Sequence, residues 1–232
     1  MGPSKTPATL SVIVPMLNEA AGIGQTLSAL AALRERGVEV IVADGGSTDG
    51  SAGIAAQLSD AVIAAPRGRA LQMNAGAGAS HGDILLFLHA DTALPAGAYI
   101  LILEALTGKS AAWGRFDVTI EGVSRMLPVV AGMMNLRSRL TGIATGDQAI
   151  FVRRSDFFAV GGFPVLPLME DIELSRRLKA RSAPVCLAQR VTTSGRRWEA
   201  NGVWRTIFLM WNLRLRYWLG APAETLAKVY HR

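Results

Sequence analysis

Short runs of β-branched residues alternate with stretches of helical periodicity over the first hundred residues, and this alternation limits the folds open to the chain. Apolar runs at 10–15, 38–43, 61–65 and 84–88 predict strands, the first of them buried. Helical patterns occupy the intervals between them, ending near Gly37, Leu58 and Ala79, and a further helix is expected from Pro95 to Leu106. Such alternation predicts parallel βαβ units, and therefore an α/β fold with a doubly wound, mostly parallel sheet flanked by helices.

The second half of the chain is less regular. Strands are expected at 113–120, 146–153 and 184–188, and helices at 125–140, 169–180 and 203–219, with a turn at 161–164. No linker, low-complexity segment or internal repeat interrupts the pattern. The simplest interpretation of the 232 residues is one domain, 1–232, with two halves.

Composition excludes several classes of protein. Half of the residues are hydrophobic and 18% are charged, which is not the composition of a disordered chain. One cysteine, Cys186, rules out an internal disulfide framework and a cysteine-rich zinc module. We see no run of about 18 apolar residues that would span a membrane, and no apolar leader at 1–7, so a cytoplasmic location is expected.

Charge is unevenly distributed along the chain. Residues 1–120 hold 7 basic and 10 acidic side chains, whereas residues 121–232 hold 17 basic and 8 acidic ones. The basic residues of the second half are almost all arginines, which suit phosphate recognition and membrane-interface contacts. Nucleic acid is not expected as a partner, because no DNA- or RNA-binding motif accompanies the charge.

Three polar clusters directly follow predicted strands: Asn18-Glu19, Asp44 to Asp49, and His89 to Asp91. In doubly wound sheets, ligands bind beyond the carboxyl ends of the strands. The three clusters should therefore meet at one edge of the sheet.

These clusters resemble the motifs of family 2 glycosyltransferases, which have the GT-A fold. The similar segments are Val14-Pro15, Asn18-Glu19, V-A-D-G-G-S-T-D-G-S at 42–51, L-H-A-D at 88–91, Glu170-Asp171, and S-G-R-R-W at 194–198 as a variant of Q-x-x-R-W. Within the family, the chain is most similar to a short bacterial subgroup with H-A-D-T, G-D-Q and R-R-W segments. The resemblance implies a nucleotide-sugar-binding half at about 8–106, an acceptor and catalytic half at about 107–200, and a separate amphipathic helix at about 201–232.

The resemblance implies a slot for the donor nucleotide lined by Pro15, Asn18 and Glu19. Asp44 ends a predicted strand, so its carboxylate could accept a hydrogen bond from a base or ribose; capping of the next helix is the simpler alternative. His89 and Ala90 belong to the same slot, with His89 as a ribose, phosphate or Mn²⁺ contact, or as an ordinary histidine at a strand end.

Asp91 is the expected metal ligand, because Mg²⁺ and Mn²⁺ prefer carboxylate and diphosphate oxygens. The family pattern is D-x-D, and His89 replaces its first aspartate. A divalent metal would neutralise charge on the departing nucleoside diphosphate. The alternative is that Asp91 is only a turn or cap residue before Pro95.

Asp171 is the expected general base, with Glu170 beside it, since attack by an acceptor hydroxyl requires removal of its proton. Direct displacement would invert the anomeric centre. The alternative is that these carboxylates only complement a helix dipole.

Further contacts to donor or acceptor are expected from both halves. The candidates are Arg67 with its neighbour Arg69, Asn74, Asp147, Gln148, Arg196, Arg197 and Trp198. Guanidinium forks suit a diphosphate and an aromatic face suits an acceptor ring. Solvated loop arginines, and a turn at 146–148, are the alternatives.

The helix at 203–219 carries an apolar stripe at four-three-four-three spacing: Trp204, Phe208, Trp211, Leu215 and Trp218. This stripe would lie in a membrane interface, placing the protein on the inner face of the cell membrane. Packing on the sheet or in a homodimer is the alternative.

We therefore expect an inverting glycosyltransferase that moves a sugar from a nucleoside diphosphate sugar, with UDP first among the donors, to a sugar, lipid-linked or small-molecule acceptor. A catalytically silent nucleotide-sugar binder or membrane-associated scaffold is the alternative, supported by His89. A sugar nucleotidyltransferase is disfavoured, because P-M-L-N-E follows the first strand where a Gly-rich phosphate loop would be needed.

Overall fold

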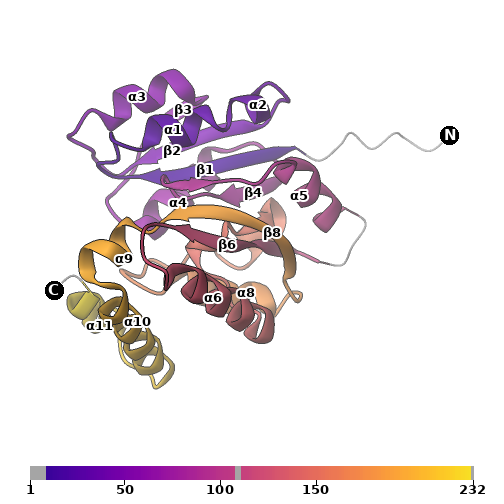
Figure 1. Ribbon diagram of the computed structural model, residues 1–232. Helices are drawn as coiled ribbons and strands as arrows, with labels where there is room; N and C mark the ends of the chain where they lie inside the picture. The colour runs from indigo at the N-terminus through magenta and orange to yellow at the C-terminus, as the bar shows by residue number, and fades with distance from the viewer. Residues whose placement is uncertain (1–8, 108–110, 231–232) are drawn as a thin grey trace.

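One mixed sheet runs through the protein in the computed structural model, which describes residues 9–107 and 111–230 (Figure 1). Its eight strands lie in the order β3-β2-β1-β4-β7-β6-β8-β5. The strands are β1 (Leu10–Met16), β2 (Glu39–Asp44), β3 (Ala61–Ala64), β4 (Ile84–Phe87), β5 (Thr92–Ala93), β6 (Trp113–Glu121), β7 (Phe151–Arg153) and β8 (Val185–Ser194). The four strands predicted in the first half are therefore confirmed, within a residue or two.

Pairing within the sheet confirms the predicted fold class. β1 pairs in parallel with both β2 and β4, and β2 pairs in parallel with β3. β7 is antiparallel to β4 and β6, β8 is parallel to β6, and β5 is antiparallel to β8. The first half is thus a doubly wound βαβ unit, and the second half extends its sheet with strands of both directions.

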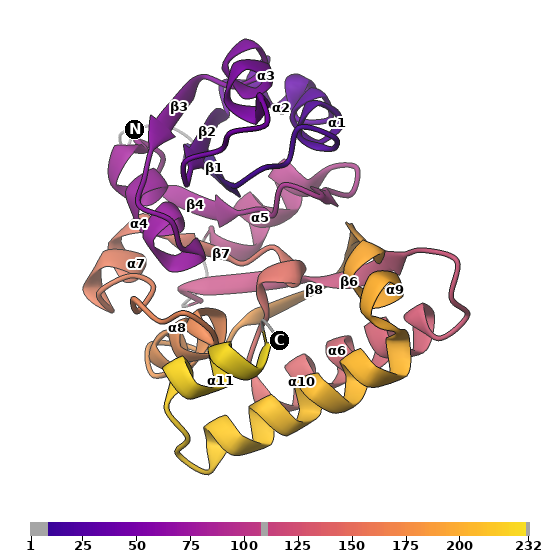
Figure 2. The same cartoon turned by 90° about the vertical axis from the view of Figure 1, so that its left-hand side faces the viewer.

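Helices cover both faces of the sheet (Figures 1 and 2). They are α1 (Ile23–Ser28), α2 (Ala31–Arg34), α3 (Ser51–Leu58), α4 (Arg69–Ala79), α5 (Ala98–Leu106), α6 (Leu127–Thr141), α7 (Arg154–Ala159), α8 (Glu170–Lys179), α9 (Arg196–Asn201), α10 (Val203–Trp218) and α11 (Ala223–Tyr230). The first predicted helix is split into α1 and α2, because the Leu30 and Leu33 amides bond three residues back at the junction.

The strand expected at 146–153 is only partly present. Gly146–Gln148 forms a short 3-10 helix, η1, closed by a capping box between Thr145 and Gln148. Only Phe151–Arg153 joins the sheet, as β7. The apolar pattern predicts strand hydrogen bonds for these backbone groups. Here the side chains of Thr145 and Gln148 bond to them instead, and a short helix forms.

Other differences lie in the second half. Helices α7, α9 and α11 had no clear sequence signal, and β8 extends to Ser194, beyond the strand expected at 184–188. β8 pairs with β6 from Gly114 to Glu121, with a shift of register between Phe116 and Asp117. Long-range pairing, rather than local propensity, determines the length of this strand.

Buried apolar side chains form one cluster on each face of the sheet, and a third beneath the last two helices. In the third cluster Leu213 and Leu226 are fully buried, joining α10 to α11. The apolar stripe of α10 points the other way: Trp204, Phe208, Trp211, Leu215 and Trp218 are all exposed. Packing of that stripe on the sheet, one of the alternatives, is therefore wrong. Among the described residues, no helix has the length and apolar character to cross a membrane.

Candidate active site

A cavity of about 520 Å³ opens beyond the carboxyl ends of β1 and β4, where side chains from both halves of the chain meet. Eleven predicted site residues line it: Pro15, Glu19, Arg67, His89, Ala90, Asp91, Asp147, Glu170, Asp171, Arg197 and Trp198. In Figure 2, α9, α10 and α11 lie below the carboxyl ends of the first-half strands. The predicted convergence of the polar clusters at one sheet edge is thus present in the fold.

Asn18 and Asp44 are predicted site residues outside the cavity lining. Both build the loops beside it. Asp44 Oδ1 accepts hydrogen bonds from the amide and hydroxyl of Ser47, at 3.0 and 2.6 Å. Asn18 has a positive φ of 52°. Its side-chain oxygen accepts a hydrogen bond from the Thr48 backbone amide, and its backbone amide donates to the Ser47 hydroxyl. These bonds tie the loop after β1 to the loop after β2.

Asn74, Gln148 and Arg196 also lie outside the lining. The Asn74 side chain makes two hydrogen bonds with the backbone of Phe163, at 2.8 and 2.9 Å. Gln148 is fully buried and caps η1. Arg196 donates to Glu19 at 3.1 Å, joining α9 to the loop after β1. The first two side chains therefore support the walls of the cavity.

The H-A-D-T segment turns sharply after β4. The Thr92 amide donates to the His89 carbonyl at 3.1 Å, and the Thr26 hydroxyl holds the Ala90 carbonyl at 2.6 Å. Asp91 lines the cavity, with the hydroxyls of Thr92 and Thr193 at 3.4 and 3.5 Å from Oδ1. The turn thus holds one carboxylate at the cavity wall.

His89 contacts the second half of the chain. Its Nδ1 lies 3.2 Å from Asp147 Oδ1, and its ring packs so closely on Gly146 that an added Cβ would lie 2.6 Å from Cε1. Burial acts to raise the pKa of Asp147, but the hydrogen bond with His89 and the charges of Arg69 and Arg214 outweigh it and lower that pKa. Asp147 is therefore held in its charged form.

Glu170 and Asp171 begin α8, where the first backbone amides have no partner within the helix. Asp171 Oδ2 accepts the Gly146 amide at 2.9 Å, so α8 and η1 are fixed to each other. Glu170 is buried and lies 3.6 Å from Arg69. Burial, with the neighbouring charge of Asp171, raises the pKa of Glu170. The two carboxylates therefore differ in environment, and Asp171 is the more exposed of the pair.

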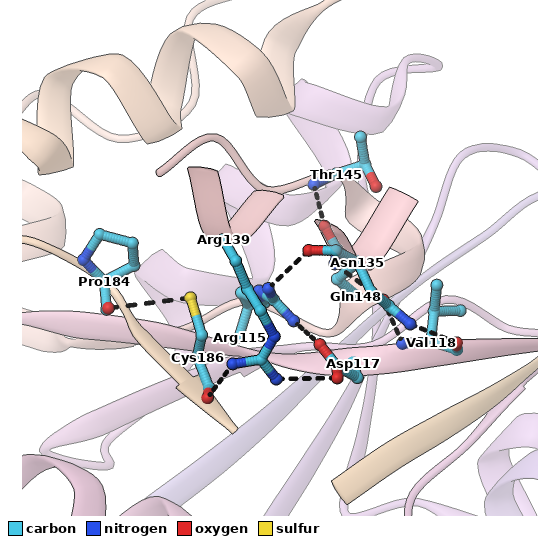
Figure 3. Close-up of polar contacts among 9 residues, drawn as sticks. All are labelled: Arg115, Asp117, Val118, Asn135, Arg139, Thr145, Gln148, Pro184 and Cys186. Carbon is cyan, nitrogen blue, oxygen red and sulfur yellow. Dashed lines mark hydrogen bonds and ion pairs between the residues drawn. The ribbon is translucent and has the colours of Figure 1, made fainter. Parts of the chain in front are cut away.

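A buried polar network supports the segment that carries Asp147 (Figure 3). Arg115, fully buried on β6, pairs with Asp117, whose other oxygen accepts from Arg139 at 2.8 Å. Asn135 on α6 bonds both backbone groups of Val118, at 2.8 and 3.0 Å, and the Gln148 amide lies 3.4 Å from it. These contacts run from α6 through β6 to η1.

Several cavity residues had no clear sequence signal. Gln72 donates to the carbonyls of Met16 and Ala43, at 2.6 and 2.9 Å, and so joins the carboxyl ends of β1 and β2. Arg214 of α10 and Tyr230 of α11 also line the cavity, and the Arg197 guanidinium lies 3.9 Å over the Tyr230 ring. Arg214 and Tyr230 reach the site only because the last two helices pack back against the edge of the sheet.

Metal binding would depend on few protein ligands. Among residues 9–107 and 111–230, no three His, Cys, Asp or Glu side chains cluster as a metal site. Asp91 supplies a carboxylate with two hydroxyls nearby, a set of hard oxygens that fits Mg²⁺ or Mn²⁺ when a diphosphate supplies further ligands. His89 faces Asp147 and Gly146 in this arrangement.

The sheet has the arrangement of the GT-A fold, and a cavity lined by carboxylates and arginines opens beyond its carboxyl edge. Residues 11–160 match the family model described as "Glycosyl transferase family 2". The chain therefore belongs to glycosyl transferase family 2. The comparison with curated protein sequences gave no significant match.

Three solved structures with the same fold are similar to this chain. The Pyrobaculum calidifontis mannosyltransferase, with GDP-Man and Mn²⁺, has a TM-score of 0.59 and 21% identity over 81% of this chain and 57% of its own. S. aureus TarS 1–349 has a TM-score of 0.65 and 18% identity over 81% of this chain and 60% of its own. Glucosyl-3-phosphoglycerate synthase of Mycobacterium tuberculosis, with Mn²⁺, UDP and glucosyl-3-phosphoglycerate, has a TM-score of 0.57 and 23% identity over 81% of this chain and 70% of its own. The chain thus spans less than two thirds of the first two structures.

Proposed function

We propose that this protein transfers a sugar from a nucleoside diphosphate sugar to an acceptor hydroxyl, with inversion at the anomeric carbon. The observation that carries the proposal is that Asp91 from the first half and Asp171 from the second half line one cavity. A donor diphosphate at Asp91 and an acceptor hydroxyl at Asp171 would then meet in the same space. Residues of about 8–106 would hold the donor, and those of about 107–200 the acceptor.

Asp171 is the proposed general base. The acceptor oxygen forms a bond to the anomeric carbon, the bond from that carbon to the diphosphate breaks, and the hydroxyl proton passes to Asp171. The hydrogen bonds from the Gly146 and Ile172 amides hold the carboxylate in one orientation during this step. Glu170 would set the local charge beside it.

The donor nucleotide is assigned to the slot formed by Pro15, Glu19 and Ala90, with Asn18 and Asp44 in the adjoining loops. Arg67 and Arg197 would pair with the diphosphate. Trp198, Asp147 and His89 would contact either sugar. Asn74, Gln148 and Arg196 would act through the segments they support.

A divalent cation, Mg²⁺ or Mn²⁺, is assigned to Asp91. When bound, it would neutralise charge on the departing diphosphate. UDP is the first donor nucleotide to test. The TarS structure with UDP-GlcNAc and the mannosyltransferase with GDP-Man show that proteins of this fold take different nucleotides. We also propose membership of the short bacterial subgroup with H-A-D-T, G-D-Q and R-R-W segments, all three of which reach the cavity.

Calorimetric titration of UDP, GDP and dTDP, each with Mg²⁺, Mn²⁺ or a chelator, tests this proposal. One nucleotide should bind in a metal-dependent manner, and Asp91→Ala should abolish that dependence. Asp171→Asn should bind the nucleotide normally but lose about 10²–10⁴-fold in transfer rate. Glu104→Gln, an exposed change on α5, is the matched control. Nucleotide binding without turnover in the wild type would favour the silent-binder alternative, and no binding would contradict the proposal.

Peripheral contact with the inner face of the cell membrane is proposed for α10. Its five stripe residues are exposed, with Trp218 at 81%, so a large apolar surface has no cover within the described chain. Residues 121–232 carry nine more basic than acidic side chains, which favours an anionic lipid surface as the occupant.

Sedimentation with anionic and neutral vesicles tests this contact. The wild type should bind anionic vesicles, and Trp211→Ala with Trp218→Ala should lose about tenfold in partition. Val123→Ala, an exposed apolar change outside α10, is the control. A concentration-dependent dimer that the tryptophan changes dissociate, without vesicle binding, would assign the face to a homodimer.

A further inference from the structure

Two arginines of the second half have no partner for their side chains in the part of the chain that the structure describes. Arg137 lies on α6 and Arg214 on α10. The Nε and Nη2 atoms of Arg137 and the Nε atom of Arg214 are buried without a hydrogen bond. A buried guanidinium without a partner loses its hydration and gains nothing in exchange.

Other arginines that pack against the protein have partners for their guanidinium groups within the chain. Arg115 is fully buried and contacts Asp117, although its Nε atom also lacks a hydrogen bond, and the half-exposed Arg181 donates twice to Asp156, at 3.0 and 2.9 Å. Arg154 donates to Ser80 and to a backbone carbonyl. Arg137 and Arg214 make no such contact among the described residues, which points to a bound anion as their partner.

The two unpaired arginines lie close enough for their charges to repel. Burial lowers the pKa of Arg137 to about 10, and the charge of Arg214 adds to this effect. Burial also lowers the pKa of Arg214, against the favourable charges of Asp171 and Asp147. An anion between them would remove the repulsion and supply the missing acceptors.

Arg214 lines the main cavity, as do Asp171 and Asp147. The candidate base and an arginine without a partner therefore face the same space. Arg205 lies on the same helix but is exposed, nine residues before Arg214 and so on the opposite side of α10. On α10, Arg214 therefore faces the cavity whereas Arg205 faces solvent.

We propose that Arg214 and Arg137 bind a phosphoryl group carried by the acceptor, whose separate hydroxyl group receives the sugar. The assignment of the phosphoryl group to the acceptor rests on the proposed function. The existence of an anion site at these two arginines does not. Two guanidinium groups offer more donors than one carboxylate can accept, and their forked geometry matches phosphate oxygens. The phosphoryl group forms and breaks no bond in the transfer.

Calorimetry with inorganic phosphate and with glycerol 1-phosphate tests the site, at constant ionic strength in chloride. Each titration is done with and without saturating UDP and Mg²⁺, so that phosphate does not report on the donor diphosphate site. We expect phosphate to bind the nucleotide-loaded protein, and Arg214→Gln and Arg137→Gln to weaken it about tenfold or more. Arg205→Gln should leave it unchanged, and glycerol should not bind.

Thermal unfolding separates this site from a structural role. Phosphate should raise the midpoint of the wild type but not that of Arg214→Met or Arg137→Met. Without phosphate, these variants should be as stable as the wild type or more so, because an unpaired buried charge is removed. Equal phosphate affinity in all variants, or loss of stability in both Met variants without phosphate, would overturn the proposal.

Two further measurements identify the source of the phosphoryl group and separate this site from the donor site. Vesicles containing phosphatidic acid should displace glycerol 1-phosphate if the group is carried by a lipid, and should fail to do so if it belongs to a soluble acceptor. Nucleotide binding is measured on the same samples. Loss of nucleotide binding in the wild type would contradict the proposed function, whereas loss of phosphate binding in Arg214→Gln alone with intact nucleotide binding supports the anion site.

Discussion

The Nδ1 atom of His89 lies 3.2 Å from Oδ1 of Asp147, which joins the H-A-D-T turn after β4 to the G-D-Q segment of η1. These residues are 58 positions apart in the chain and come from different halves of the sheet. The contact holds the two halves together at the cavity, where Asp91 and Asp171 also lie. His89 therefore positions the second half against the first.

Asp147→Asn tests this contact. The pKa of Asp147 is lowered in the folded protein, so its charged form adds stability above its usual pKa of 3.8, and that contribution is lost as the pH falls. At pH 7 the variant should lose about 1 kcal/mol of unfolding free energy, because the side chain is partly exposed. Urea unfolding from pH 3 to pH 7 measures this. An unchanged pH profile would contradict the assignment.

Gly146→Ala should displace the His89 ring. The added Cβ would lie 2.6 Å from Cε1 of His89, and the Gly146 amide also donates to Asp171. We expect a loss of about 1–3 kcal/mol in unfolding free energy, and reduced transfer. Gly132→Ala, on α6 with open space around its Cα, is the control and should be neutral or stabilising. Equal effects of the two changes would show that the close packing is unimportant.

Gln72→Ala should weaken the edge of the sheet that forms the donor slot. The side chain is 4% exposed and donates to the carbonyls of Met16 and Ala43. Its removal takes one hydrogen bond from each carbonyl, although the Met16 carbonyl still accepts from the Gly45 amide at 2.9 Å, and it leaves a cavity, at a cost of about 2–4 kcal/mol. Denaturant unfolding and nucleotide titration measure the effect. Gln57→Ala, exposed on α3, should have little effect on either quantity.

Glu170→Gln should change the pH dependence of stability. The pKa of Glu170 is raised above 4.5 in the folded protein by burial and by Asp171, so the native state keeps this proton to higher pH than the unfolded chain does. The unfolding free energy of the wild type therefore falls as the pH rises from 4.5 through the raised pKa. The variant should show a smaller fall over that range in urea unfolding, whereas Glu104→Gln should keep the wild-type slope.

Local patterns were sufficient for most of the first half. The apolar runs predicted β1, β2, β3 and β4. In β1, β2 and β4 the runs are continuous because these strands are buried on both faces, whereas β3, at the sheet edge, is only partly buried. The same rule placed Glu19 and Asp91 at the carboxyl edge. It did not distinguish Asp44 and Asn18, whose side chains bind neighbouring loops, from residues that face the cavity.

The second half was less predictable because its signals are not local. η1 interrupts an apolar run, since the Thr145 and Gln148 side chains cap the backbone there. Arg115 and Asn135 are buried through mutual contacts that no periodicity reveals. Helix α10 was predicted, but whether its tryptophans faced the core was not, since an amphipathic stripe fits a core, a membrane or a partner equally well.

The sequence by itself determined the α/β class, the strands of the first half, and the carboxylates that follow them, because these depend on the order of apolar and polar residues along short segments. Only the tertiary structure decided that Asp147 faces His89, that Gln72 joins two strands, and that Arg137 and Arg214 have no partner in the described chain. The physical reason is that pairing between distant residues depends on how the sheet and the last helices pack, and the chain order does not encode that packing locally.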